Sequence, residues 1–341
     1  MIYFISLIIL SYNMTINNFY GLLITINNHT IFEQYVNNNK NTKFRIFSCS
    51  KPITGLAIIL LSQMKLLNLH DTLTKFNINI PNNNNITVYH LLQHTSGIYD
   101  FISRFYFDLT PINLFNNITH NFYTDFIDFN TIIHHINKNL YIPSNFNKFV
   151  YNNTGYDILG YIIYIVTGMY SHDFITQYIF IPLKMYNSNF QCNFDLNESI
   201  PFDNSKKIAI KEQQNWFSGN AFIVCTLRDL NIFISNYHIL LNHYHLNLYE
   251  NLYYFKPMFF KQNILKSMSH EGGGDFSYLH SINKEKYISL SKSFFIKFTD
   301  SYNNIITVIL SENFRNNHDG FFVNNKFILK KIINIVLQCF Y

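Results

Sequence analysis

The chain has 341 residues, which suits one large domain or two ordinary ones, because domains run to ~100–200 residues and α/β folds often exceed that. Hydrophobic residues make up 48% and charged residues only 13%, a balance that excludes a disordered protein and predicts a sizeable buried core. The formal charge of +5 is spread thinly, with no basic cluster denser than the pairs at 206–207 and 330–331, so we expect no nucleic-acid partner.

The first candidate element is the apolar run at residues 2–10, about half the ~20 residues that a membrane-spanning helix needs. No Lys or Arg precedes it, the first being Lys40, and it lacks a small-residue cleavage site. The run therefore fits either a buried first strand or helix or the core of a signal peptide. The compartment stays open between cytoplasmic and secreted, and we expect no membrane association beyond this segment.

Two β-type runs, at residues 20–26 and 30–36, are separated by a short Asn-containing turn and predict a hairpin. From Pro52 the pattern changes to an apolar stripe at i, i+3 and i+4, which predicts a helix that buries one face. Pro52 fits the first turn of this helix, where its missing N–H needs no partner. Residues 48–51 are therefore expected at a helix N-terminus.

Further helical stretches follow between residue 66 and about residue 210, separated by Asn-rich loops, notably at 87–93 and 156–167. Thr226 can cap a later helix. Strands are then predicted at 276–282, 287–298 and 305–310, and an apolar helix at 327–340.

The simplest assembly is an α/β (α+β) fold, an antiparallel sheet flanked by helices with an inserted, mostly helical lobe. The sheet domain is expected from residues 1–65 with 213–341, and the lobe from 66–212. We expect the active site in the cleft between them. Ser48 lines it from the helix start, Tyr151 from a loop of the lobe and His270 from an edge strand.

The first chemical signal is Ser48-Cys49-Ser50-Lys51, in which a hydroxyl and an amine three residues apart meet on one helix face. A Ser/Lys nucleophile requires this geometry. A Lys amine with its ordinary pKa of ~10.4 is a poor base, so its environment must lower that pKa, and the positive end of the helix dipole contributes to this. By itself the motif also fits an ordinary capped helix.

Further segments accompany this motif in a fixed order. Residues 44–61 read FRIFSCSKPITGLAIILL, residues 88–101 read VYHLLQHTSGIYDF, and residues 149–168 read FVYNNTGYDILGYIIYIVTG. With the segments at 217–234 and 270–281, they resemble the signatures of the superfamily of class C β-lactamases, D-alanyl-D-alanine carboxypeptidases and related esterases. The resemblance covers the chain from about residue 20 onward and implies a β-lactamase/transpeptidase-like fold.

This resemblance implies that Ser48 attacks the substrate carbonyl and forms an acyl-enzyme, while Lys51 and Tyr151 move its proton. Tyr151 can act as a base only if a neighbouring cation favours its phenolate, which Lys51 is expected to do. Asn153 is expected to orient the substrate amide and the Lys51 amine. Without the other motifs, Tyr151 reads as a half-buried loop aromatic.

The last signature reads His270-Glu271-Gly272-Gly273, where the classical β-lactamases and carboxypeptidases carry Lys-Thr-Gly. His is mostly neutral at pH 7, so the fixed charge for a substrate carboxylate is absent. His-x-Gly resembles the esterase and D-aminopeptidase branches, in which Glu271 either binds a substrate amine or faces solvent. The N–H of Gly273 and that of Ser48 are the expected oxyanion hole.

Three other features carry less chemistry. His94-Thr95-Ser96-Gly97 is interpreted as a turn, with the hydroxyls bonding local backbone and Gly97 at positive φ. The loop at 218–220 has Asn220 where paired glycines are common, so Asn220 is either left-handed or the turn is rebuilt. The four cysteines lie far apart and no histidines show metal-ligand spacing, so we expect no zinc, no other metal, no cofactor and no disulfide framework.

The sequence thus predicts a serine hydrolase of the Ser-x-x-Lys type, acting through a Ser48 acyl-enzyme on small-molecule esters, amides or D-amino-acid peptides. Two alternatives remain. A catalytically inactive relative, retained as a binding or assembly module, shares the same fold. A true β-lactamase is disfavoured by the missing Lys of Lys-Thr-Gly.

Overall fold

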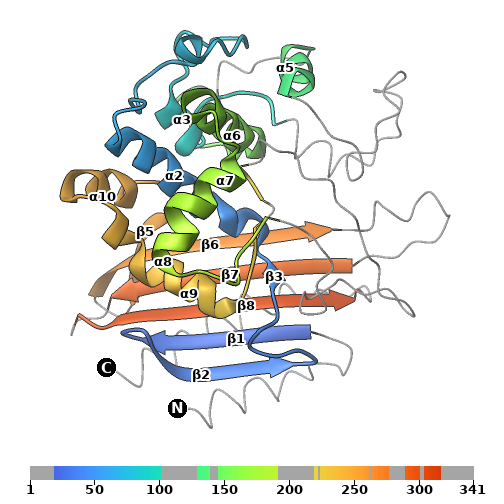
Figure 1. Cartoon of the computed structure of the whole chain (residues 1–341), viewed down its shortest axis with the longest axis vertical. Helices are drawn as coiled ribbons and strands as arrows, with labels where there is room; N and C mark the ends of the chain where they lie inside the picture. Colours follow the sequence, from blue (N-terminus) through green and yellow to red (C-terminus); the bar gives the residue numbers. More distant parts are fainter. Residues whose placement is uncertain are drawn as a thin grey trace, which may run out of the picture.

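The computed structural model describes residues 19–100, 129–138, 145–190, 219–221, 223–260, 263–275, 289–299 and 303–315. Within them, a six-stranded sheet has the order β2-β1-β8-β7-β6-β5, with every pair antiparallel. Its strands are β1 (Phe19–Ile26), β2 (His29–Val36), β5 (Phe255–Phe260), β6 (Asn263–Asp275), β7 (Ser289–Thr299) and β8 (Ile305–Arg315). The predicted antiparallel sheet, built from segments near both ends of the sequence, is confirmed (Figure 1).

The predicted hairpin is β1 and β2. Asn27 and Asn28 form its turn with left-handed φ values of 48° and 66°, which Asn tolerates better than most residues. On its other side β1 pairs with β8, placing Leu22 opposite Leu310. This pairing joins the start of the described chain to its end.

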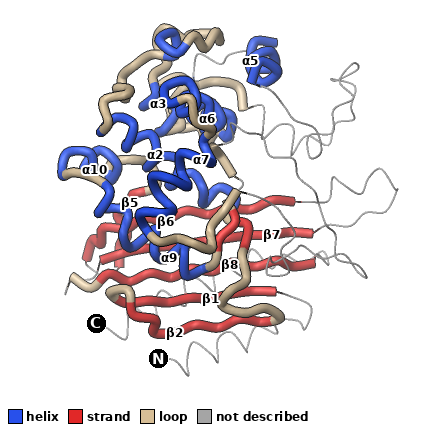
Figure 2. The backbone as a smooth tube through the Cα atoms, in the orientation of Figure 1, coloured by secondary structure: helices blue, strands red, loops and turns tan. Residues whose placement is uncertain are grey.

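Helices gather beside the sheet, beyond β5 and β6, while α9 lies across β8 and β1 (Figures 1 and 2). The longer elements are α2 (Lys51–Gln63), α5 (Phe129–Lys138), α6 (Asn153–Thr167), α9 (Leu227–Asn236) and α10 (His243–Glu250). The shorter ones are β3 (Phe44–Arg45), η1 (Phe47–Ser50), η2 (Leu73–Phe76), α3 (Val88–Leu92), α7 (Ser171–Ile175), η5 (Thr176–Phe180), α8 (Ile181–Leu183), β4 (Val224–Cys225) and η6 (Tyr237–Leu240). The helices α3, α6 and α9, the last capped by the Thr226 side chain, agree with the sequence predictions.

The prediction that the helix after Ser48 buries one face was wrong. All residues of α2 from Lys51 to Leu61 are buried, because the helix packs against α6, α7 and α10 as well as the turn η1 that carries Ser48. A helix enclosed on every side needs apolar residues all round, as residues 56–61 of this one show. The turn that carries Ser48 is therefore attached to a fully buried helix.

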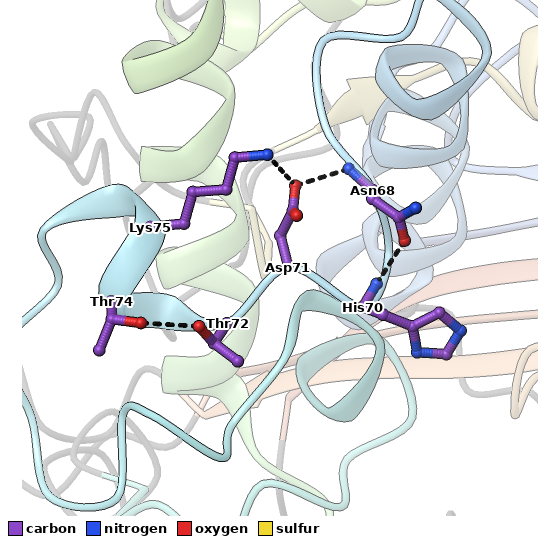
Figure 3. A network of polar contacts seen from close by, with 6 residues as sticks. All are labelled: Asn68, His70, Asp71, Thr72, Thr74 and Lys75. Atoms are coloured by element: carbon purple, nitrogen blue, oxygen red, sulfur yellow. Dashed lines mark hydrogen bonds and ion pairs between the residues drawn. The ribbon is translucent and has the colours of Figure 1, made fainter.

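The chain leaves α2 through an exposed turn that local polar contacts fix (Figure 3). The Asp71 carboxylate accepts hydrogen bonds from the Asn68 backbone N–H at 2.7 Å and from Lys75 Nζ at 2.7 Å. The His70 backbone N–H donates to Asn68 Oδ1 at 2.9 Å. These contacts direct the chain from α2 to η2.

Other strand predictions had mixed outcomes. The strands at 287–298 and 305–310 correspond to β7 and β8, whereas β5 was not predicted, because a proline such as Pro257 argues against a strand. The predicted elements at 2–10, 276–282 and 327–340 lie outside the described residues. The division into residues 1–65 with 213–341 and a lobe of 66–212 stays a prediction.

The expectation that His270 lies on an edge strand needs correction. The strand β6 pairs with β7 along one side and with β5 along the other, so β5 is the edge. The ladder with β5 ends at Phe255 opposite Met268, however, and His270 lies just beyond it. The second half of β6 therefore extends past the edge strand beside the Ser48 turn.

None of the described helices is by itself both long and apolar enough to cross a membrane. One pair, Asn153–Thr167 with Ser171–Leu183, passes that test of length and composition together but bends by 80°.

Candidate active site

The structure brings Ser48 and Lys51 together at the junction of η1 and α2. Lys51 Nζ donates to Ser48 Oγ at 2.9 Å, to Asn153 Oδ1 at 2.7 Å and to the Asn220 carbonyl at 3.0 Å. Ser48 is partly exposed, whereas Lys51 is 0% exposed. The nucleophile candidate is thus accessible, and the amine beside it is sealed from water.

Burial lowers the pKa of Lys51 to about 7, against opposing contributions from Asp157, Asp100 and Cys49. Burial is the largest cause, so the depression that we expected from the helix terminus has mainly a different origin. A neutral amine has two N–H groups and one lone pair. With Asn153 and the Asn220 carbonyl accepting the two N–H groups, the lone pair is left to accept the Ser48 hydroxyl proton.

Tyr151 lies in the loop before α6, and its ring centroid is 4.9 Å from Lys51 Nζ. The Ser48 and Tyr151 side chains share a hydrogen bond. Although Tyr151 is 37% exposed, burial of its phenol end raises its pKa above the ordinary value, and Lys51 is not among the causes. Burial thus works against the Tyr151 phenolate that we expected Lys51 to favour, and the role of Lys51 towards Tyr151 stays a prediction.

Phe47, the residue before Ser48, adopts a left-handed φ of 44°. For a bulky residue this is a true outlier, and such strain persists only where the surroundings enforce it. Two anchors flank it: the Ile46 backbone N–H donates to the Ile223 carbonyl, and the Cys49 thiol donates to the carbonyls of His270 and Ser293. The strained turn projects Ser48 next to β6.

The predicted turn at His94 to Gly97 is confirmed, and it contacts the start of α6. Gly97 has φ 69° and the Ser96 hydroxyl accepts from the local backbone N–H of Ile98. His94 Nδ1 accepts the backbone N–H of Asn152 at 3.0 Å, next to Tyr151 and Asn153. The turn therefore holds the start of α6, whose N-cap is the Asn152 side chain.

His270 is 8% exposed and lies on β6 within reach of the other groups, its ring centroid 6.3 Å from that of Tyr151. His270 Nδ1 donates to the Glu271 carbonyl at 2.8 Å, because a carbonyl can only accept. His270 Nε2 shares a hydrogen bond of 2.7 Å with the Tyr253 hydroxyl, which can donate to a neutral ring or accept from a protonated one. Both ring nitrogens therefore have a partner, which orients the imidazole. Gly272 and Gly273 follow on the same strand, opposite Ser293 and Lys292 of β7.

Sequence reasoning missed several residues of the site. The Asn220 carbonyl and the Tyr253 hydroxyl belong to it, and neither follows from a local motif. Asn220 is not among the described residues with positive φ, so the turn at Gly219 and Asn220 does not hold Asn220 left-handed. Within the described residues, no group of three or more His, Cys, Asp or Glu side chains is arranged to hold a metal ion.

Comparisons with known proteins identify the family and the fold. A family model described as Beta-lactamase matches residues 20–243. Protein flp of Staphylococcus aureus is 31% identical over 208 residues, which cover 58% of this chain and 39% of that protein. Penicillin-binding protein 4* of Bacillus subtilis is 33% identical over 147 residues, 42% of this chain and 30% of that protein. The chain thus spans well under half the length of these relatives.

Solved structures show the same fold. FmtA from Staphylococcus aureus has a TM-score of 0.68 at 19% identity, covering 98% of this chain and 86% of its own. D-amino acid amidase from Ochrobactrum anthropi SV3, complexed with L-phenylalanine amide, has a TM-score of 0.68 at 16% identity, covering 99% and 98%. The match of the family model over most of the chain shows that this protein belongs to the Beta-lactamase family, within the serine hydrolase superfamily of the β-lactamase and penicillin-binding type.

Proposed function

We propose that this protein is an active serine hydrolase that forms an acyl-enzyme on Ser48 and acts on esters, small amides or D-amino-acid peptides. One observation carries the proposal. A fully buried amine with a pKa of about 7 lies 2.9 Å from the hydroxyl of a partly exposed serine. Because the ideal pKa of a general base lies near the working pH, Lys51 is suited to accept the Ser48 proton.

In the acylation step, Ser48 Oγ forms a bond to the substrate carbonyl carbon while its proton passes to the Lys51 lone pair. The tetrahedral intermediate then collapses, and the bond from carbon to the leaving group breaks. Tyr151, a neutral phenol hydrogen-bonded to Ser48, donates its proton to the leaving atom and takes up the proton that Lys51 holds. No net proton is gained or lost.

The negative charge on the carbonyl oxygen needs donors that are already in place. We assign the backbone N–H groups of Ser48 and Gly273 to this task. In support, the Cys49 thiol donates to the His270 carbonyl, which keeps the Ser48 turn beside β6. A water molecule then attacks the acyl-enzyme by the reverse route, with Lys51 accepting its proton and Ser48 leaving.

The nature of His270 favours neutral substrates over substrates that carry a carboxylate. Both of its ring nitrogens are engaged, one with the Tyr253 hydroxyl and one with the Glu271 carbonyl. Unlike a lysine, an imidazole has no permanent positive charge to offer a substrate carboxylate, which a penicillin or a free peptide C-terminus carries. Neutral esters and amides fit better. The likeness to D-amino acid amidase points to D-amino-acid amides as the first amides to test, with Asn153 holding the amide.

A fluorophosphonate probe tests the nucleophile directly. The wild-type protein should be labelled, and mass spectrometry of the digested protein should place the adduct on Ser48. Ser48→Ala is the matched control and should remain unlabelled. Labelling of Ser48→Ala to the same extent, or a folded wild type that is never labelled across pH 6–10, refutes the proposal. The second result favours a binding or assembly module.

Turnover tests the substrate class. Short-chain p-nitrophenyl esters and D-phenylalanine amide should be hydrolysed with a kcat/KM well above that for nitrocefin. A higher kcat/KM for nitrocefin than for the esters would instead indicate a true β-lactamase.

A further inference from the structure

Asp157 is a buried carboxylate that the proposed reaction does not use. It lies on α6 one turn after Asn153, so that both side chains point to the same side of the helix. Asp157 is 1% exposed, and its Oδ1 accepts the Asn220 side-chain amide at 2.6 Å and the Gly219 backbone N–H at 3.3 Å. Burial of a carboxylate costs free energy unless hydrogen bonds or a cation compensate, so the burial of Asp157 has to be accounted for.

The turn that Asp157 holds is clamped between two helices. On the α2 side, the Thr54 hydroxyl donates to the Gly219 carbonyl at 2.7 Å. On the α6 side, a Cβ on Gly219 would lie 2.2 Å from the Tyr156 carbonyl, so only glycine permits this approach. With Gly219 fixed on both sides, the next carbonyl in the chain, that of Asn220, lies 3.0 Å from Lys51 Nζ.

We propose that Asp157 is a positioning residue for Lys51: it holds the Gly219–Asn220 turn so that the Asn220 carbonyl binds one N–H of Lys51, and its charge favours the protonated amine. This inference rests on the proposed function, in which Lys51 accepts the Ser48 proton. Asp157 does not touch the substrate. It acts by fixing the direction of the Lys51 lone pair and by setting the pH at which that lone pair appears.

The charged surroundings of Lys51 support this role. Asp157 is first among the groups that raise the pKa of Lys51, ahead of Asp100 and Cys49, and together they oppose the larger effect of burial. The other titratable groups near this amine are the phenols Tyr151 and Tyr156 and the imidazole His94, and Tyr151 in turn faces His270 and Glu271 on β6. Removing the Asp157 charge should therefore make Lys51 lose its proton at lower pH.

Asp157→Asn and Asp157→Ala separate the two effects. Asn keeps an oxygen for the turn but removes the charge, so the acid limb of kcat/KM should move down by about one pH unit with the plateau within about threefold. Ala removes the clamp as well, so kcat at the plateau should fall by about tenfold or more with KM little changed. Asp229→Asn is the control, because Asp229 is also a buried carboxylate, 3% exposed, that accepts hydrogen bonds from Asn187 and Ser188.

An NMR titration of Lys51, with its Nζ and Cε signals assigned through Lys51→Arg, gives a readout that needs no activity. The midpoint should be near 7 in the wild type and in Asp229→Asn, and lower in Asp157→Asn. An unchanged midpoint and an unchanged acid limb in Asp157→Asn would overturn the inference, as would an equal shift in Asp229→Asn. If fluorophosphonate never labels Ser48, the proposed function fails while this titration still decides whether Asp157 controls Lys51.

Discussion

The Tyr253 hydroxyl and His270 Nε2 lie 2.7 Å apart, in a hydrogen bond. His270 Nδ1 donates to the Glu271 carbonyl, so both ring nitrogens have a partner and the ring is held in place. The position at which the classical β-lactamases and carboxypeptidases carry a lysine is thus occupied by an imidazole, which has no permanent positive charge.

This relationship predicts the effect of restoring a cation. His270→Lys should raise kcat/KM for a carboxylate-bearing substrate such as nitrocefin, relative to a neutral ester, by about tenfold or more, since a charge-assisted hydrogen bond contributes ~1.5–3 kcal/mol. His270→Gln is the matched control, because its amide can accept from Tyr253 and donate to Glu271 without a charge. An equal change of the ratio in both variants would show that charge at this position does not govern selectivity.

The pH dependence of kcat/KM follows from Lys51. Only the neutral amine can accept the Ser48 proton, so kcat/KM should rise with pH and reach half its plateau near pH 7, where burial places the pKa of Lys51. Burial raises the pKa of Tyr151, so its ionisation should cause no fall below about pH 10. Hydrolysis of p-nitrophenyl acetate from pH 5 to 10 at constant ionic strength measures this profile.

Two substitutions separate the proton carriers. Lys51→Ala and Tyr151→Phe should each lower kcat by about 10²–10⁴-fold while KM changes little, since both groups act on the barrier. The acid limb should disappear in Lys51→Ala and persist in Tyr151→Phe. A loss confined to KM in either variant would assign that residue to substrate binding instead.

Lys51 should lower the stability of the fold although activity requires it. The pKa of Lys51 falls from 10.5 to about 7 on folding, so between these values the unfolded chain binds more protons than the folded one. The free energy of unfolding therefore rises with pH from about 7 to 10.5. Lys51→Met should raise the melting temperature at pH 6.5 more than at pH 10, because at pH 10 most of the stability that the lowered pKa of Lys51 costs at pH 6.5 has been regained. Calorimetry at the two pH values checks this, and an equal gain at both would contradict it.

The sequence predicted the elements whose formation depends on residues that are neighbours in the chain. The hairpin of β1 and β2 follows from two β-type runs around an Asn turn, and α9 follows from its Thr226 cap and apolar stripe. The strand β5 was missed because it contains Pro257, which is tolerated there since β5 is at the edge of the sheet. Burial of α2 on all sides depends on helices that arrive from distant parts of the chain.

The candidate site likewise contains some groups that the sequence predicted and others that it could not. Ser48 and Lys51 are three residues apart, so helix geometry alone brings them together, and the order of the motifs pointed to Tyr151 and Asn153. The Asn220 carbonyl could not be predicted, because backbone atoms carry no sequence signal. Asp157 had a weak signal, as a charged residue on the apolar helix α6 at four residues from Asn153. Its partner in the loop before α9 has no sequence periodicity that would reveal it.

The left-handed backbone at Phe47 predicts that glycine at this position is more stable than alanine. Phe47→Gly and Phe47→Ala both remove the aromatic ring and its packing, so their difference isolates the backbone. Glycine adopts positive φ freely whereas alanine is strained there, and Phe47→Gly should unfold with a free energy about 1 kcal/mol higher than Phe47→Ala. Urea denaturation of the two variants measures this difference. If alanine were equally stable, the turn before Ser48 would not be strained, and Phe47 would hold the nucleophile through side-chain packing alone.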